Sequence, residues 1–141
     1  VEMLSVEQYR EFALPRHREY LDALGTEKGR GIHLCGNAQR LFPTLHQELG
    51  IMAFDTGFPV DFARFRQEMG PEVLISGGPR APLFVEDRPD ALLAETRRIL
   101  GTGVLEGGRF ILQEGNNLPP CASLEHCQAF YALGRELGRV G

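Results

Sequence analysis

The chain has 141 residues, a length typical of one domain, and 43% hydrophobic with 24% charged residues indicates a globular fold. Its formal net charge of −4, without a basic stripe, argues against nucleic acid as a partner. No apolar run approaches the roughly 18 to 20 residues that cross a bilayer, and no signal-peptide pattern is present. We therefore expect a cytoplasmic protein that does not bind membranes, and the three cysteines favour free thiols or metal ligands over disulfides.

The first predicted element is a helix from Ser5 to about Leu24. Ser5 and Gln8 have the spacing of a capping box, and apolar residues recur after them at helical intervals. Pro15 lies inside this segment and predicts a kink or a break. Because the sequence opens at Val1 without an initiator Met, we expect a fragment of a longer chain.

Four short apolar runs follow, each succeeded by a segment with helical periodicity. The expected strands are 32–35, 51–55, 72–77 and 109–115, and the expected helices are 38–49, 60–69, 89–100 and 123–137. Glycines at or just beyond the helix ends, where a left-handed cap favours them, are Gly50, Gly70, Gly101 and Gly138. Strands and helices that alternate in this way predict an α/β fold: four parallel βα units, preceded by a helix, in one domain over residues 1–141.

Alternation along each strand separates two faces of the predicted sheet. Large apolar side chains such as Met52 and Phe54 should lie beneath the helices. The opposite face then carries the side chains of His33, Cys35, Asp55 and Ser76. A single helical layer leaves this face and two sheet edges open, so either further strands close the sheet or the chain is half of a barrel.

His33 and Cys35 lie on one face at the carboxyl end of the first strand, where (β/α) folds place their active sites. Imidazole and thiolate are donors that zinc prefers, but a buried core histidine and an inert cysteine would give the same pattern. Asp55 ends the second strand and is read as a metal ligand, as a carboxylate that orients His33, or simply as a loop or helix cap.

The ends of the third and fourth strands add further candidates. Gly77 and Gly78 lack side chains, so they either let a ligand approach the backbone closely or form only a tight turn. The loop after the fourth strand gathers the polar residues Gln113, Glu114, Asn116, Asn117 and Cys121. If the four strands are neighbours, Cys121 approaches His33 and Cys35. Cys127 is expected to be a core residue, and the histidines expected to be surface or satisfied residues are His17, His46 and His126.

The ordered motifs "HLCGN", "FDTG" and "GGRFIL…G…LPP" resemble the C-terminal half of the uroporphyrinogen decarboxylase superfamily. The resemblance implies half of a TIM (β/α)8 barrel, with the N-terminal half absent. That superfamily includes the decarboxylase of haem synthesis and zinc-dependent methyltransferases that act with corrinoid proteins or thiols.

By this resemblance the methyltransferase branch supplies residue roles. Its H-x-C pair matches His33 and Cys35, its acidic position matches Asp55, and its third cysteine aligns with Asn116, so Cys121 is the substitute ligand. Zinc on these residues would activate a thiol or an ether oxygen for methyl transfer, with a corrinoid protein as partner. Glu114 and Asp55 are then the catalytic candidates, and Asn116, Asn117, Gly77 and Gly78 the substrate-binding ones.

Two alternatives remain. The first is a decarboxylase, although its catalytic aspartate and most carboxylate-binding arginines belong to the absent half, leaving Arg40 and Arg80 at the strand ends. The second is a non-catalytic half-barrel whose inner face is covered by self-association.

Overall fold

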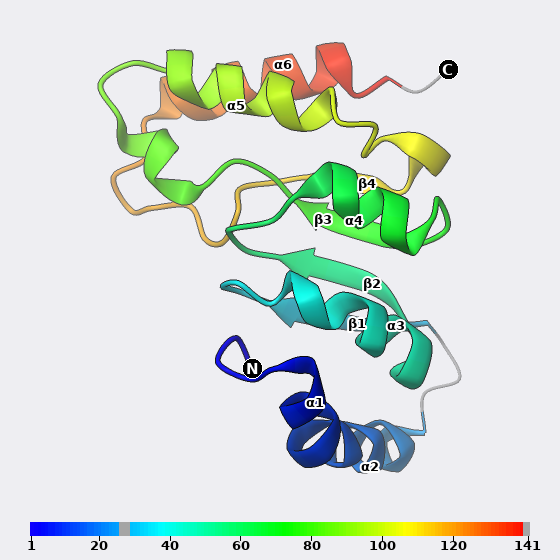
Figure 1. The fold of residues 1–141 in the computed structure, drawn as a ribbon. Coiled ribbons are helices and arrows are strands. Elements are labelled where there is room, and N and C mark those ends of the chain that lie inside the picture. Colours follow the sequence, from blue (N-terminus) through cyan, green and yellow to red (C-terminus); the bar gives the residue numbers. More distant parts are fainter. Residues whose placement is uncertain (26–28, 140–141) are drawn as a thin grey trace.

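A computed structural model describes residues 1–25 and 29–139 (Figure 1). The helices are α1 (Val6–Gln8), α2 (Leu14–Leu24), α3 (Phe42–Leu49), α4 (Phe62–Met69), α5 (Asp90–Leu100) and α6 (Leu124–Leu137). The strands are β1 (Arg30–Leu34), β2 (Ile51–Thr56), β3 (Leu74–Gly77) and β4 (Phe110–Leu112). Short 3-10 turns cover Gln39–Leu41, Ala81–Val85 and Glu106–Gly108. No helix within the described ranges is long and apolar enough to cross a membrane.

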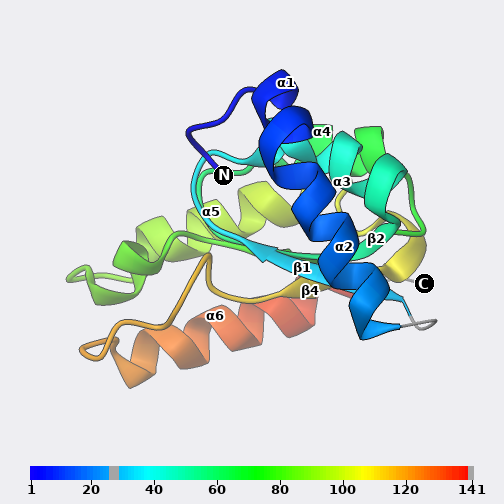
Figure 2. The same cartoon turned by 90° about the horizontal axis from the view of Figure 1, so that it is seen from below.

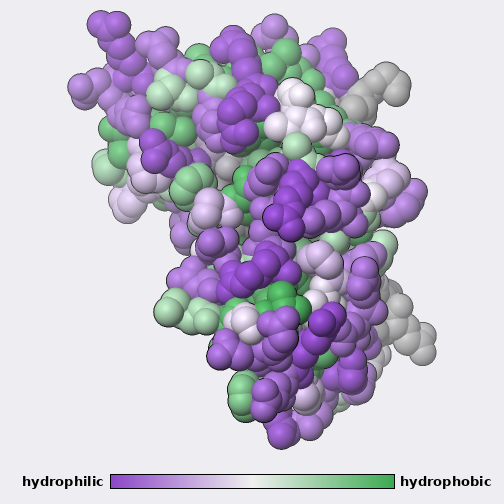
Figure 3. Space-filling model, in the orientation of Figure 1, coloured by the Kyte–Doolittle hydropathy of each residue, from purple (hydrophilic) through white to green (hydrophobic). Residues whose placement is uncertain are grey.

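The strands form one parallel sheet in the order β1-β2-β3-β4, as the alternating pattern predicts. Helices α3 and α4 cover one face, α1 and α2 lie beyond the β1 end, and α5 runs beside α6 at the other end (Figures 1 and 2). This is the α/β architecture of a half barrel, with both sheet edges unpaired among the described strands. The helix-covered side seen in Figure 3 is mostly hydrophilic over α3 and α4, because their apolar sides face the sheet.

The N-terminal segment stays helical through Pro15, with a change in its hydrogen-bonding pattern just before the proline. Ser5 and Gln8 form the expected capping box. A π-helical turn over Tyr9–Ala13 then joins α1 to α2, and Pro15 lies in the first turn of α2. Proline has no amide hydrogen to donate, and a wider turn before it removes the clash with the preceding carbonyl, so the chain stays helical.

The main core lies between the sheet and the helices on its covered face. Phe42, Phe54 and Phe65 form a buried aromatic group with ring centroids 4.7 to 5.4 Å apart. A second, smaller cluster joins Leu83, Phe84 and Leu92 to α6, where Cys127 packs beside it as expected. One prediction was wrong: Met52 is 37% exposed rather than buried. The β1–β2 register shifts at this point, so that Ile51 and Phe54 take the buried positions.

The four predicted glycines divide into two kinds of helix end. Gly50 and Gly70 both have positive φ, but only Gly50, with ψ of 31°, forms the predicted left-handed cap, since ψ of Gly70 is 175°. Gly101 and Gly138 follow α5 and α6 with φ of −79° and −84°, so the left-handed prediction is wrong there.

Arg66 on α4 is the largest feature of the core that periodicity did not reveal. Its side chain is 3% exposed, and its guanidinium donates to four backbone carbonyls, those of Gly70, Val73, Val104 and Arg109. Burial lowers the pKa of Arg66, and the nearby Glu106 opposes that effect. Because these carbonyls precede β3 and β4, Arg66 fixes the amino ends of the two strands relative to α4.

Candidate active site

One polar row crosses the sheet on the face opposite α3 and α4. The strand register places His33 beside Asp55, Asp55 beside Ser76, and Ser76 beside Ile111. The side chains of His33 and Asp55 are 50% and 45% exposed, and Ile111 is 49% exposed. The inner face predicted from strand alternation is therefore confirmed, and its side chains are open rather than packed as a core.

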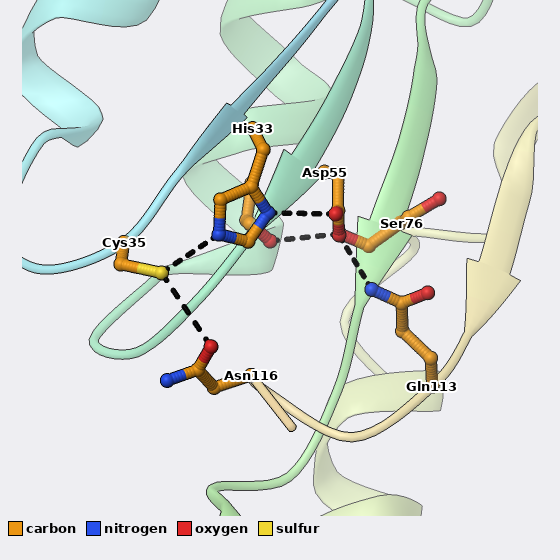
Figure 4. A network of polar contacts seen from close by, with 7 residues as sticks. His33, Cys35, Asp55, Ser76, Gln113 and Asn116 are labelled. Atoms are coloured by element: carbon orange, nitrogen blue, oxygen red, sulfur yellow. Dashed lines mark hydrogen bonds and ion pairs between the residues drawn. The ribbon is translucent and has the colours of Figure 1, made fainter. Parts of the chain in front are cut away.

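The row continues into a hydrogen-bonded chain of side chains (Figure 4). Gln113 Nε2 lies 2.5 Å from Asp55 Oδ1, and Asp55 Oδ2 lies 2.7 Å from His33 Nδ1. His33 Nε2 lies 2.8 Å from Cys35 Sγ, which is 3.6 Å from Asn116 Oδ1. The chain thus joins β1, β2 and the loop after β4 at the carboxyl ends of the strands.

Gly57, which follows β2, lets Cys35 and the β4–α6 loop approach each other. A Cβ atom at Gly57 would lie 3.1 Å from Cys35 Cα and 3.2 Å from the carbonyl oxygen of Gly115. A larger residue would have to push the two segments apart. Gly57 therefore helps to bring Cys35 to Asn116, although periodicity gave it no role.

The partners of His33 decide where its proton lies. An ionised carboxylate only accepts hydrogen bonds, so the contact with Asp55 places the ring proton on Nδ1. Nε2 then presents its lone pair to Cys35, whose thiol can donate to it. A thiol carries one hydrogen, so Cys35 can donate to His33 Nε2 or to Asn116 Oδ1, but not to both at once.

His33 and Cys35 fit two positions of a zinc site. Zinc–nitrogen and zinc–sulfur bonds of about 2.0 and 2.3 Å place two tetrahedral ligands roughly 3.5 Å apart, so the pair would separate slightly around an ion. The carboxylate on the far nitrogen is the partner that zinc-binding histidines usually have. Within residues 1–25 and 29–139, however, no group of three His, Cys, Asp or Glu side chains is arranged to hold a metal.

Asp55 makes the contact that an orienting carboxylate requires, which is one of the roles considered for it. Its two oxygens contact His33 and Gln113, so direct metal ligation would require it to release one of these partners. Cys121 is exposed in the turn before α6, outside the hydrogen-bonded chain. Glu114 is half-buried and Asn117 exposed, and neither side chain hydrogen-bonds to the chain that Gln113 begins.

Gly77 and Gly78 have packing roles within the fold. A Cβ at Gly77 would lie 2.5 Å from Thr56 Oγ1, and one at Gly78 would lie 1.9 Å from the carbonyl oxygen of Gln113. The close approach that these glycines permit is thus made by β2 and by the segment after β4. The space in which a ligand was expected beside them is already filled.

The remaining histidines are satisfied, as predicted. His17 Nδ1 contacts the hydroxyl of Tyr9 at 2.8 Å, and His46 Nδ1 contacts the carbonyl of Ile51 at 2.8 Å. His126 is buried with Nδ1 3.2 Å from the carbonyl of Phe84.

Comparison with known proteins agrees with this architecture. The family model described as uroporphyrinogen decarboxylase (URO-D) matches residues 1–137. A solved methyltransferase from Methanosarcina mazei matches with a TM-score of 0.73 and 18% sequence identity, over 96% of this chain. The chain spans 39% of the length of that methyltransferase, and at this identity the likeness shows the fold. No curated protein matches.

Proposed function

The chain belongs to the uroporphyrinogen decarboxylase family, and we propose that it is the metal-binding half of a methyltransferase barrel. In this proposal, the complete enzyme transfers a methyl group between a methylated small molecule or thiol and a corrinoid protein. The observation that carries the proposal is the Asp55–His33–Cys35 arrangement, which combines an imidazole nitrogen, a thiol and an orienting carboxylate.

His33 and Cys35 would hold zinc, with Cys121 as the proposed third ligand. When bound, zinc would supply a Lewis acid that favours the ionised form of a substrate thiol or polarises an ether oxygen. Asp55 keeps the His33 proton on Nδ1, which leaves the lone pair of Nε2 available to bind the metal. Asn116, whose Oδ1 lies 3.6 Å from the sulfur of Cys35, is proposed to contact a substrate at the same position.

Methyl transfer to a thiol requires no oxidant. The thiolate sulfur forms a bond to the methyl carbon while the cobalt–carbon bond breaks, and the electron pair stays on cobalt, giving a thioether and a cob(I) corrinoid. With a methyl ether as donor, cob(I) corrinoid would form the bond to the methyl carbon while the carbon–oxygen bond breaks, and the leaving oxygen would keep the electron pair and take a proton from water to become a hydroxyl. Asn117 and Glu114 lie on the same loop and are proposed to contact the part of the substrate that does not react.

One observation weighs against the decarboxylase alternative. Arg40, one of two arginines expected to face a substrate, donates instead to the backbone carbonyls of Glu2, Leu4 and Asn37. Arg80 remains, whereas a uroporphyrinogen with eight carboxylates requires several cationic partners.

The other half of the proposed active site would come from the N-terminal half of the barrel or from self-association. Apolar side chains are exposed at both ends of the described sheet. They are Tyr20 and Leu24 on α2, at 65% and 53%, and Leu124 and Tyr131 on α6, at 72% and 65%. A partner that covers these two ends would remove the apolar side chains from water. Light scattering tests the self-associating alternative, since it requires a dimer or larger assembly.

A methyl-transfer assay tests the proposal. The longest natural polypeptide that contains these residues is loaded with zinc and mixed with methylcobalamin and a small thiol. Thioether formation is followed by mass spectrometry, with loss of the methylcobalamin absorbance measured in parallel. We expect turnover that falls at least about 100-fold in Cys35→Ala.

Cys121→Ala and Cys127→Ala form a matched pair for this assay. If Cys121 is the third ligand, its loss lowers zinc affinity and turnover, while Cys127→Ala, beside the second core cluster, leaves both unchanged. No methyl transfer by the zinc-loaded protein, or release of carbon dioxide from uroporphyrinogen by the same preparation, would contradict the proposal.

A further inference from the structure

Gln113 is the one member of the side-chain network to which neither motif nor resemblance gave a role. It follows β4, two strands away from Asp55, and its amide reaches across Ser76 to the carboxylate (Figure 4). Its backbone amide independently donates to the carbonyl of Gly77 at 3.0 Å. The strand pairing therefore does not depend on the side chain, which is free to serve the site.

The two oxygens of Asp55 are divided between two donors. Oδ1 accepts from Gln113 Nε2 at 2.5 Å, and Oδ2 accepts from His33 Nδ1 at 2.7 Å. Because the His33 and Asp55 side chains are about half exposed, packing alone does not hold their orientation. A carboxylate that accepts hydrogen bonds at both oxygens keeps a fixed orientation. A carboxylate with a single hydrogen-bond partner can rotate toward water.

We propose that Gln113 is a positioning residue that, through Asp55, holds His33 in the Nδ1-protonated tautomer with Nε2 directed at Cys35. This inference rests on the proposed function for its purpose, since the presented nitrogen is the proposed zinc donor. A neutral amide suits the role because it donates without adding charge. A glutamate at this position would set a second carboxylate against Asp55 and would offer no donor when ionised.

Heteronuclear NMR of the metal-free chain tests the inference directly. Long-range proton–nitrogen correlation spectra report which ring nitrogen of His33 carries the proton, and a His33→Ala spectrum assigns the signals. Spectra are taken at about pH 8.5, above the ordinary titration range of imidazole. We expect Nδ1 protonation in the wild type and in Gln128→Leu, an exposed glutamine on α6 that serves as the matched control.

In Gln113→Leu, and in Gln113→Glu, we expect signals from both tautomers. Zinc affinity, measured by competition with a chelator, should fall about 10- to 100-fold in both variants. Far-ultraviolet circular dichroism checks that each variant is folded. If Gln113→Leu does not fold, Gln113→Glu decides, because it preserves the size of the side chain while removing the donor.

The inference is overturned if a folded Gln113 variant keeps the wild-type tautomer, or if the wild type carries its proton on Nε2. The tautomer measurement uses no metal and no methyl donor, so it separates this inference from the proposed function. If the wild type binds no zinc, the zinc site is refuted. If His33 nevertheless loses its Nδ1-protonated tautomer in Gln113→Leu, the positioning role is supported.

Discussion

Replacing Arg66 by methionine should cost more stability than any other single change to a charged side chain in the described fold. The guanidinium is 3% exposed and donates four hydrogen bonds to backbone carbonyls at 2.7 to 3.1 Å. At about 1.5 kcal/mol for each bond from a charged donor, the loss is about 6 kcal/mol. Burial of the methionine side chain returns about 2 kcal/mol, which leaves a net loss of about 4 kcal/mol.

Arg64→Met is the matched control because it makes the same chemical change two residues away on α4. Arg64 pairs with Glu68 at 2.7 Å on the surface, where its side chain is 60% exposed. An exposed pair of this kind contributes little to stability because water screens it. Arg66→Lys keeps a positive charge but lacks the planar fork of donors, so its loss should fall between those of the two methionine variants.

Urea unfolding followed by circular dichroism measures these differences as changes in the free energy of unfolding. The reasoning is refuted if Arg66→Met loses less than about 1 kcal/mol, or if it loses no more than Arg64→Met. Because Arg66 joins α4 to the starts of β3 and β4, a smaller loss would mean that other contacts fix those strands.

Two further predictions concern packing and alkaline stability. Gly78→Ala places a Cβ 1.9 Å from the carbonyl oxygen of Gln113 and should lower the free energy of unfolding in urea by about 2 to 4 kcal/mol. Gly29→Ala, with open space around its Cβ, should lower it by about 1 kcal/mol or less. Equal losses in the two variants would contradict the steric argument. Burial raises the pKa of Tyr9 to about 12, with a further contribution from Glu48. The unfolded chain loses this proton first, near pH 10. Tyr9 should therefore lower the free energy of unfolding by about 2 to 3 kcal/mol between pH 10 and 12. This contribution should be absent in Tyr9→Phe.

The order of strands and helices could be predicted because each strand and helix has its own periodicity and end signals. Ser5 capped the first helix as expected, and alternation correctly put His33 and Cys35 on the face opposite Ile32 and Leu34. Met52 was misplaced because a β-bulge changes the phase of a strand without leaving a mark in its local composition.

The candidate site could be predicted only in part, because its contacts join distant segments. His33, Cys35 and Asp55 follow from strand ends, and the register confirms that they are neighbours. Gln113 contacts Asp55 across 58 positions of sequence, and Arg66 binds carbonyls that no side-chain pattern reports. A glutamine placed directly after a strand that carries Ile111 on the same face was the available signal for Gln113.

The central claim is that His33 and Cys35 form a metal-binding pair, and zinc stoichiometry tests it most directly. The wild type, His33→Ala, Cys35→Ala and the control Cys127→Ala are loaded with zinc and dialysed extensively before elemental analysis. We expect about one equivalent of zinc in the wild type and in Cys127→Ala, and little in the other two variants. Well under one equivalent in the wild type, or full retention by Cys35→Ala, would contradict it.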